Sequence, residues 1–226
     1  MQIPAEPRPI EFRLDTAALI IIDMQRDFLE PGGFGESLGN DVNRLRGVIA
    51  PTSKLLHAAR RVGVFVVHTR EGHRADLSDV PKAKLERGAP SMRIGDLGPM
   101  GRILIQGEAG HDIVPELRPA AGEPVIDKPG KGAFYQTSLD LMLRNRQVVT
   151  LFVCGVTTEV CVHTTVREAN DRGFRCIVVA DCCASYFPEF HTMGLRMITA
   201  QGGIFGWVAQ SADLIAAMEE QASTNK

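Results

Sequence analysis

Six short, mostly apolar runs recur along the chain, and they are rich in β-branched and aromatic residues. They lack the polar alternation of a half-exposed strand, which is typical of strands buried on both faces. Strands of that kind occur in parallel sheets that helices cover on both sides. The sheet is therefore predicted to comprise residues 17–22, 64–69, 124–127, 148–153, 176–180 and 204–208.

Segments with helical spacing separate these runs. One extends from about Asp41 to Arg61, with an interruption at Pro51 and an end at Gly63. Alternating strands and helices predict a single-domain, three-layer α/β/α fold around a mostly parallel, Rossmann-like six-stranded sheet. Further helices are expected at 139–146, from about Cys161 to Gly173, at 191–201 and at 212–220.

The length of 226 residues and an apolar content of 44% suit one domain over residues 1–226. Residues 1–13 form a polar, proline-containing arm that we expect to be irregular and to pack on a partner subunit. Residues 70–122 are rich in glycine, proline and charge. Such an insertion is usually a lid, a specificity loop or a subunit contact.

Composition argues against several classes of partner. A net charge of −2 gives no reason to expect binding to nucleic acid or to an anionic membrane. No apolar stretch reaches membrane-spanning length, and the N-terminus lacks the apolar core of a signal peptide. The five cysteines, an odd number in a chain of this size, are expected to be reduced in a cytoplasm.

Cys161 lies between a predicted buried strand and a predicted helix, in about the first turn of that helix. Backbone N–H groups there are unpaired and the helix dipole favours an anion, which favours a thiolate nucleophile. The alternative is a buried structural cysteine.

Two other ionisable residues follow predicted strands. Asp23 ends the first run and Lys128 follows the third. Functional groups gather at the carboxyl ends of parallel strands, so we expect both near Cys161. Asp23 would act as general acid–base, while Lys128 would stabilise a thiolate and an oxyanion. Alternatively, Asp23 is a turn residue and Lys128 a solvated surface charge.

Backbone N–H groups from Thr157 to Cys161 could form an oxyanion hole. Three further motifs follow one another along the chain: residues 21–28 (IIDMQRDF), 127–134 (DKPGKGAF) and 155–161 (GVTTEVC). Together they resemble the isochorismatase-like cysteine hydrolases over about residues 14–215. The resemblance implies an Asp23–Lys128–Cys161 triad and a cis peptide between Val156 and Thr157 that aims the oxyanion-hole N–H groups.

Within that family, the chain is most similar to the triuret and biuret hydrolases. The segments that carry this likeness are 68–74, 93–96, 127–132, 167–173 and 201–203. The likeness implies that Phe28, Lys131 and Gln201 line the substrate pocket.

The loop at residues 182–190 is more aromatic than in biuret hydrolases, and Tyr186 and Glu189 could hold the far end of a longer ureide. Alternatively, Tyr186 and Phe187 simply pack beneath the insertion. The segments at 188–190 and 205–208 look more like ureidoacrylate amidohydrolases.

No cofactor and no metal ion are expected. Residues 69–73 differ from the metal-binding segment of nicotinamidase relatives, and no glycine-rich nucleotide loop follows a strand. His163 is poorly placed as a base, because it lies two residues from Cys161 on another helix face.

The sequence thus predicts an amidohydrolase that cleaves a C–N bond of a small linear ureide through a Cys161 thioester and releases ammonia. Triuret is the first expected substrate and biuret the second. The alternatives are a ureidoacrylate amidohydrolase and a non-enzymatic binding protein on the same fold. The resemblance also implies a homotetramer.

Overall fold

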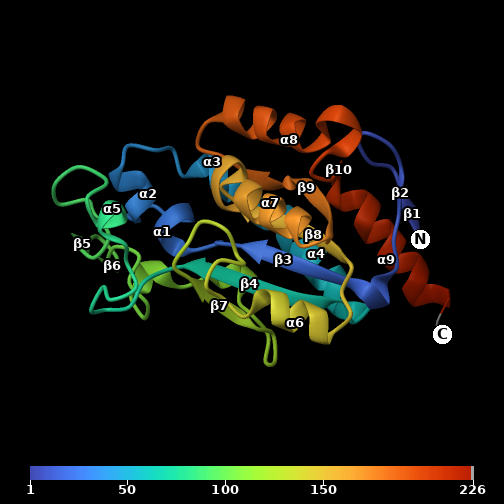
Figure 1. The fold of residues 1–226 in the computed structure, drawn as a ribbon, viewed down its shortest axis with the longest axis horizontal. Coiled ribbons are helices and arrows are strands. Elements are labelled where there is room, and N and C mark those ends of the chain that lie inside the picture. Colours follow the sequence, from blue (N-terminus) through green and yellow to red (C-terminus); the bar gives the residue numbers. More distant parts are fainter. Residues whose placement is uncertain (225–226) are drawn as a thin grey trace.

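A computed structural model describes residues 1–224 and has a six-stranded parallel sheet at its centre (Figure 1). The strand order is β10-β9-β8-β3-β4-β7. The predicted fold class is therefore confirmed. The strands are β3 (Ala17–Ile22), β4 (Phe65–Glu71), β7 (Val125–Lys128), β8 (Thr150–Val156), β9 (Arg175–Ala184) and β10 (Trp207–Ala209).

Strand β3 lies in the middle of the sheet, and all six of its residues are buried. It pairs in parallel with β4 on one side and β8 on the other, so that Leu19 is opposite both Val66 and Phe152. Burial on both faces explains why its sequence is a continuous apolar run. This packing fixes the carboxyl end of β3, where Asp23 follows.

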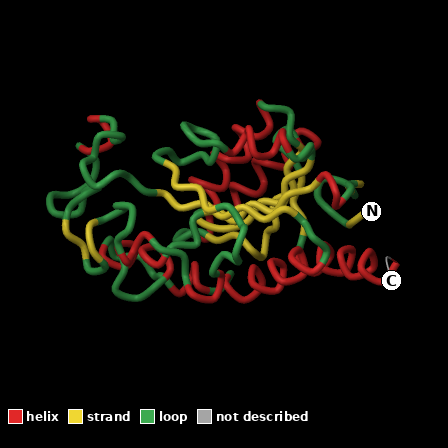
Figure 2. Tube along the Cα trace, turned by 90° about the horizontal axis from the view of Figure 1, so that it is seen from below, coloured by secondary structure: helices red, strands yellow, loops and turns green. Residues whose placement is uncertain are grey.

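Helices cover both faces of the sheet (Figure 2). The sheet order places α4 and α9, which pack against each other, on one face, and α6, α7 and α8 on the other (Figure 1). Their bounds are α4 (Ile49–Arg61), α6 (Leu139–Asn145), α7 (His163–Asp171), α8 (Pro188–Gly203) and α9 (Ser211–Thr224). Among the described residues, every helix is too short or too polar to cross a bilayer.

The predicted helix over residues 41–61 is two helices, α3 (Asn43–Arg46) and α4. The break lies at Gly47 and Val48, so the expected interruption at Pro51 is wrong. Pro51 lies in the first turn of α4. Proline is tolerated there because backbone N–H groups of a first helical turn have no partner within the helix.

The N-terminal arm is more ordered than expected. It contains the short paired strands β1 (Gln2–Ile3) and β2 (Ile10–Glu11). Glu6 exchanges two backbone hydrogen bonds with Val208, of 2.9 and 3.0 Å. The arm therefore covers the edge strand β10 of its own chain, an edge that would otherwise present unpaired backbone groups.

The predicted insertion extends beyond the carboxyl edge of the sheet, beside α1 (Arg26–Leu29) and α2 (Phe34–Ser37) (Figure 1). It begins slightly later than expected, because β4 continues to Glu71. Its regular elements are all short: α5 (Lys82–Leu85), β5 (Leu97–Gly98), β6 (Gly101–Arg102) and 3-10 turns at Ala109–His111 and Pro115–Leu117.

Candidate active site

Asp23 and Lys128 form a fully buried ion pair. Asp23 follows β3 and Lys128 is the last residue of β7, so both project from the carboxyl edge of the sheet. Lys128 Nζ lies 2.7 Å from Asp23 Oδ2, and both side chains are 0% exposed. The alternative of a solvated Lys128 is therefore wrong, and Asp23 does more than end a turn.

Further hydrogen bonds fix both partners of this pair. The Thr69 hydroxyl donates to Asp23 Oδ1 over 2.6 Å, while the Asp23 N–H donates to Thr69 Oγ1 over 3.2 Å. Lys128 Nζ also donates to the carbonyl oxygens of Gly130 and Lys131, at 3.1 and 2.9 Å. A buried charge is tolerated only with partners of this kind.

Burial alone would lower the pKa of Lys128, but the charge of Asp23 opposes it most strongly, followed by those of Cys161 and Glu71. The outcome is a pKa raised above the ordinary value for lysine. Lys128 therefore stays protonated and serves as a fixed positive charge rather than as a proton donor.

Cys161 lies in a π-helical turn, Thr158–Val162, that leads directly into α7. This placement agrees with the expected position at the start of a helix. The peptide bond between Val156 and Thr157 is cis, as the family resemblance implied. Cys161 is buried at 5% exposure.

The expectation that this turn favours a thiolate is not supported. Burial raises the pKa of Cys161 well above its ordinary value, against the lowering effect of Lys128. The nearby carboxylates of Asp23 and Glu71 raise it further. Cys161 is therefore a thiol at neutral pH, and a base must remove its proton before it can attack.

Glu71 is a buried carboxylate that lies beside Cys161. The sequence predicted no role for it. It ends β4 opposite Lys128, and its side chain is 1% exposed. The Cys161 thiol donates to Glu71 Oε2 over 3.7 Å. Gln25 holds the Glu71 backbone by accepting from its N–H at 2.7 Å and donating to its carbonyl at 3.0 Å.

Two lysines pair with Glu71. Lys131 Nζ lies 2.8 and 2.9 Å from its two carboxylate oxygens, and Lys84 Nζ lies 3.0 Å from Oε1. Burial raises the pKa of Glu71, but Lys131, Lys128 and Lys84 together outweigh it and lower the pKa to about 2. Glu71 is therefore a permanent carboxylate at neutral pH.

Lys84 belongs to α5 and brings a charge from the insertion into this cluster. Its Nζ also donates to the Pro129 carbonyl at 2.6 Å and to His73 Nε2 at 2.9 Å. Because Nε2 accepts, His73 is a neutral imidazole, which agrees with burial lowering its pKa. The insertion thus contributes directly to the electrostatics around Cys161.

Donor atoms of Asp23, Glu71 and Cys161 lie within 4.8 Å of one another, a spacing that could hold a metal ion. Both carboxylates already pair with lysine ammonium groups, which supply the positive charge at this position. The expectation that no metal participates stays a prediction.

The structure brings Lys131 to the triad through Glu71, and the hydrogen bond that it shows between Tyr186 and Phe28 does not involve the triad. Tyr186 donates its hydroxyl to the Phe28 carbonyl over 2.7 Å, so these two residues tie the β9–α8 loop to α1. Glu189 lies exposed in the first turn of α8. This hydrogen bond joins Tyr186 to α1 and not to the insertion, and Phe187 is exposed, so packing of both rings beneath the insertion stays a prediction.

Gln201 is not brought to the triad within this chain. It is exposed near the C-terminal end of α8, where the carbonyl of Gly202 accepts from Arg8 of the arm at 2.7 Å. Helix α8 runs back from the carboxyl end of β9 towards the start of β10 (Figure 1). Its last turn therefore lies at the opposite edge of the sheet from the turn between β8 and α7, which holds Cys161.

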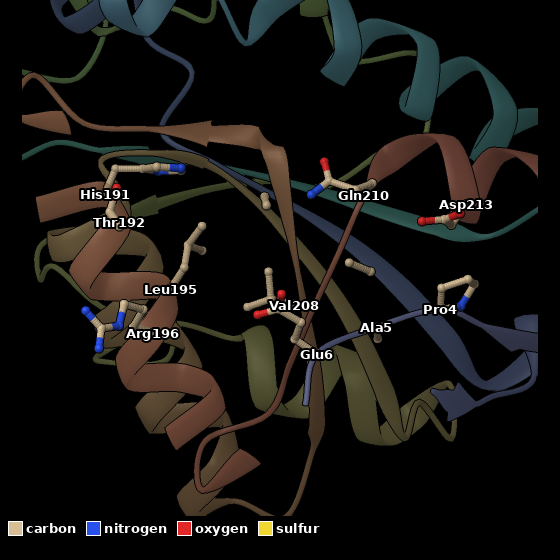
Figure 3. Close-up of a pocket in the computed structure, with 12 residues that line it drawn as sticks. Pro4, Ala5, Glu6, His191, Thr192, Leu195, Arg196, Val208, Gln210 and Asp213 are labelled. Atoms are coloured by element: carbon tan, nitrogen blue, oxygen red, sulfur yellow. The ribbon is translucent and has the colours of Figure 1, made fainter. Parts of the chain in front are cut away.

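A cavity of about 500 Å³ lies elsewhere, between the arm, α8 and the β10 region (Figure 3). Leu195 and Arg196 of α8 line one side, and Pro4 and Glu6 of the arm line another. None of the triad residues lines it. The titratable cluster, and not this cavity, marks the carboxyl edge of the sheet as the candidate active site.

Glu71 and Lys84 could not have been assigned from the sequence in the same way as the triad. Glu71 lies two residues beyond the strand predicted at 64–69, so it lacked the position directly after a buried run that identified Asp23. Lys84 had no signal, because it lies in an insertion whose path over the site is not encoded by periodicity.

Comparison with known proteins places these residues in context. Residues 17–213 match the model of the isochorismatase domain. A ureidoacrylate amidohydrolase from Methylorubrum extorquens is 34% identical over 228 residues, covering 96% of this chain and 88% of that protein.

Two solved structures are similar in fold. A cysteine hydrolase from Pseudomonas syringae pv. phaseolicola 1448A has a TM-score of 0.78 and 29% identity, covering 92% of this chain and 95% of its own. An N-carbamoylsarcosine amidase from Thermoplasma acidophilum has a TM-score of 0.66 and 25% identity, covering 87% and 96%.

Proposed function

Because this chain belongs to the isochorismatase family, we propose that it is a cysteine-dependent amidohydrolase that cleaves a C–N bond of a small ureide, with ureidoacrylate as the first candidate substrate. The observation that carries the proposal is the buried Asp23–Lys128 pair beside Cys161. It provides a base, a fixed positive charge and a nucleophile in one water-poor site.

The reaction begins when Asp23 takes the thiol proton of Cys161. The thiolate then attacks the terminal carbamoyl carbon, and Lys128 with the backbone N–H groups of Thr157 and Cys161 stabilises the oxyanion. Ammonia leaves with a proton that Asp23 returns. The remaining thioester is an S-carbamoyl adduct on Cys161, which still carries the rest of the substrate.

Water completes the cycle. Asp23 removes a proton from the water, which attacks the thioester carbon and releases Cys161. The product is an N-carboxylated amine, a carbamate that loses carbon dioxide without help from the protein. Each turnover therefore releases one ammonia and restores both the thiol and the Asp23 carboxylate.

The order of substrates differs from the sequence-based prediction, which put triuret first and biuret second. The relative described above is named a ureidoacrylate amidohydrolase, and its likeness spans almost the whole chain. The charge of the site also favours this order. Three lysines face two carboxylates, so the cluster carries one net positive charge while Cys161 is a thiol. That charge would attract an anionic ureide more than a neutral one.

The proposal is tested by ammonia release from a panel of ureidoacrylate, triuret, biuret and nicotinamide. We expect the highest kcat/KM with ureidoacrylate, and no release above background from Cys161→Ala. The variant should fold normally, because alanine fills most of the space that the buried thiol fills.

Two outcomes would contradict the proposal. If no compound of the panel is turned over, the alternative of a non-enzymatic binding protein is favoured. Retained turnover in Cys161→Ala would refute the mechanism instead.

A further inference from the structure

The Glu71 carboxylate has four hydrogen-bond contacts, and the mechanism above uses none of them. Oε1 accepts from Lys84 at 3.0 Å and from Lys131 at 2.8 Å. Oε2 accepts from Lys131 at 2.9 Å and from the Cys161 thiol at 3.7 Å. The nucleophile of the proposed reaction is thus hydrogen-bonded to a carboxylate other than Asp23.

The thiol is the weakest of these four donors. An ammonium-to-carboxylate contact is a strong, charge-assisted hydrogen bond, whereas an S–H group donates weakly. An amide N–H is a better donor than a thiol, so it would displace Cys161 from Oε2 before it displaced Lys131. A ureide carries N–H groups on both sides of the carbonyl that Cys161 attacks.

We propose that Glu71 is a catalytic residue that couples substrate binding to activation of Cys161. In the resting protein, Glu71 Oε2 accepts a hydrogen bond from the Cys161 thiol. When substrate binds, it accepts a hydrogen bond from a substrate N–H instead. The displaced S–H then faces Asp23, whose carboxylate lies within 4.8 Å of both other groups. The S–H bond breaks, an O–H bond forms on Asp23, and a thiolate is left beside Lys128. This inference rests on the proposed function.

The charges around Cys161 support this coupling. Glu71 and Asp23 both disfavour the thiolate, and Lys128 and Lys131 favour it. A substrate N–H that donates to Glu71 Oε2 offsets part of the negative charge of Glu71, which otherwise disfavours the thiolate. The groups that face the π-helical turn come from several elements: Asp23 after β3, Glu71 on β4, Lys128 on β7, Lys131 after β7, and His191 of α8, whose Nδ1 lies 2.8 Å from Thr158 Oγ1.

The coupling also defines a substrate class. A compound must present an N–H next to the attacked carbonyl, so a ureide that is N-methylated at that position should react poorly. A plain primary amide has only the N–H groups of its leaving ammonia. The resting thiol is meanwhile kept unreactive towards other electrophiles.

The test is the pH dependence of Cys161 alkylation by iodoacetamide in wild type, Glu71→Gln and Glu71→Asp. Glutamine removes the negative charge, so the pH at which the alkylation rate of Cys161 is half-maximal should fall by about one pH unit or more in Glu71→Gln. This pH is called the midpoint below. Aspartate keeps both lysine partners but retreats from Sγ, so its midpoint should fall by less. The midpoint is compared, and not the rate, because nucleophilicity falls as the pKa falls.

Two controls accompany the titration. Cys161→Ala reports background labelling of the other four cysteines, which are all buried. Glu219→Gln makes the same charge change in an exposed ion pair with Arg61 on α4 and should leave the midpoint unchanged. An unchanged or raised midpoint in both Glu71 variants would overturn the inference, and Glu71→Asp keeps the test available if Glu71→Gln does not fold.

The substrate part is tested on the wild-type protein. Against the best substrate of the panel, its N-methylated analogue should lose at least about tenfold in kcat/KM, the effect of one missing hydrogen bond to a charged group. Equal turnover of the two compounds would refute the exchange at Glu71. If no panel compound reacts but the midpoint still falls, the proposed function fails while the charge coupling stands.

Discussion

Asp23 and Lys128 form an ion pair in a part of the molecule that water does not reach. Removing either partner leaves the other as an uncompensated buried charge, which typically costs about 3–5 kcal/mol. Removing both leaves no such charge. The two residues that carry the proposed reaction therefore also stabilise the fold at the carboxyl edge of the sheet.

We predict that Asp23→Asn and Lys128→Met each lower the free energy of unfolding by about 3–5 kcal/mol, and that the double variant loses less than the sum. Asparagine suits position 23 because Asp23 has a φ of 48°, a left-handed conformation that asparagine tolerates. Urea unfolding monitored by circular dichroism measures this. Additive losses would show that the pair is not energetically coupled.

At this scale, the triad residues were predictable and their neighbours were not. Asp23 and Lys128 each end a buried apolar run, and such ends meet at one edge of a parallel sheet. The protonation of Cys161 was not predictable, because it depends on burial and on Glu71 rather than on the helix start. Gln201 was assigned by resemblance alone, and within the chain α8 takes it to the far edge of the sheet.

Among the elements, β8 carries the strongest local constraint. Gly155 pairs with Ile22 of β3 and has a φ of 117°. A Cβ at this position would overlap the carbonyl oxygen of Ile22. Glycine therefore lets the two strands approach just before the turn that holds Cys161.

We predict that Gly155→Ala costs about 3 kcal/mol or more, since backbone strain and overpacking add. Gly173, after α7, is the matched control: its φ is 82°, but a Cβ there has no neighbour within 4 Å. Gly173→Ala should cost only about 1–2 kcal/mol. Comparable losses in thermal or urea unfolding would contradict the role of the close strand approach.

Strand and helix order followed from periodicity, because each central strand is a continuous apolar run between helical segments. The boundaries shifted where tertiary contacts decide them. Helix α8 starts at Pro188, three residues before the expected start, and β10 is Trp207–Ala209, which overlaps the expected 204–208 only at its last two residues. The short elements of the insertion lack a hydrophobic periodicity from which they could be predicted.

At the scale of the whole molecule, two carboxylates connect surface segments to the sheet. Glu71 binds Lys84 of the insertion, and Glu123 binds Arg60 of α4 through two contacts of 2.7 and 2.8 Å. Burial raises the pKa of Glu123, but its hydrogen bonds with Arg60, Ala120 and His68 outweigh this and lower it to about 2. Both groups thus have folded pKa values below the ordinary 4.5.

A lowered pKa stabilises the fold above the unfolded value and loses that contribution as pH falls. We predict that unfolding becomes easier between about pH 4.5 and about pH 2. Glu123→Gln should reduce the slope of unfolding free energy against pH in this window by at most about one proton. Urea unfolding at several pH values checks it, and a slope identical to wild type would contradict the assignment.

Assembly stays a prediction. The expected homotetramer can be checked by sedimentation, and the expected cytoplasmic location by fractionation. The arm pairs with β10 of its own chain through Glu6, and its expected packing on a partner subunit stays a prediction as well.

The most direct test of the central claim is mass spectrometry of protein quenched during turnover of ureidoacrylate. We predict an adduct on Cys161 whose mass is that of the substrate less ammonia. With a terminal amide labelled with heavy nitrogen, the label should appear in the released ammonia and not in the adduct. An adduct on another residue, or turnover in which Cys161 never carries one, would contradict the account.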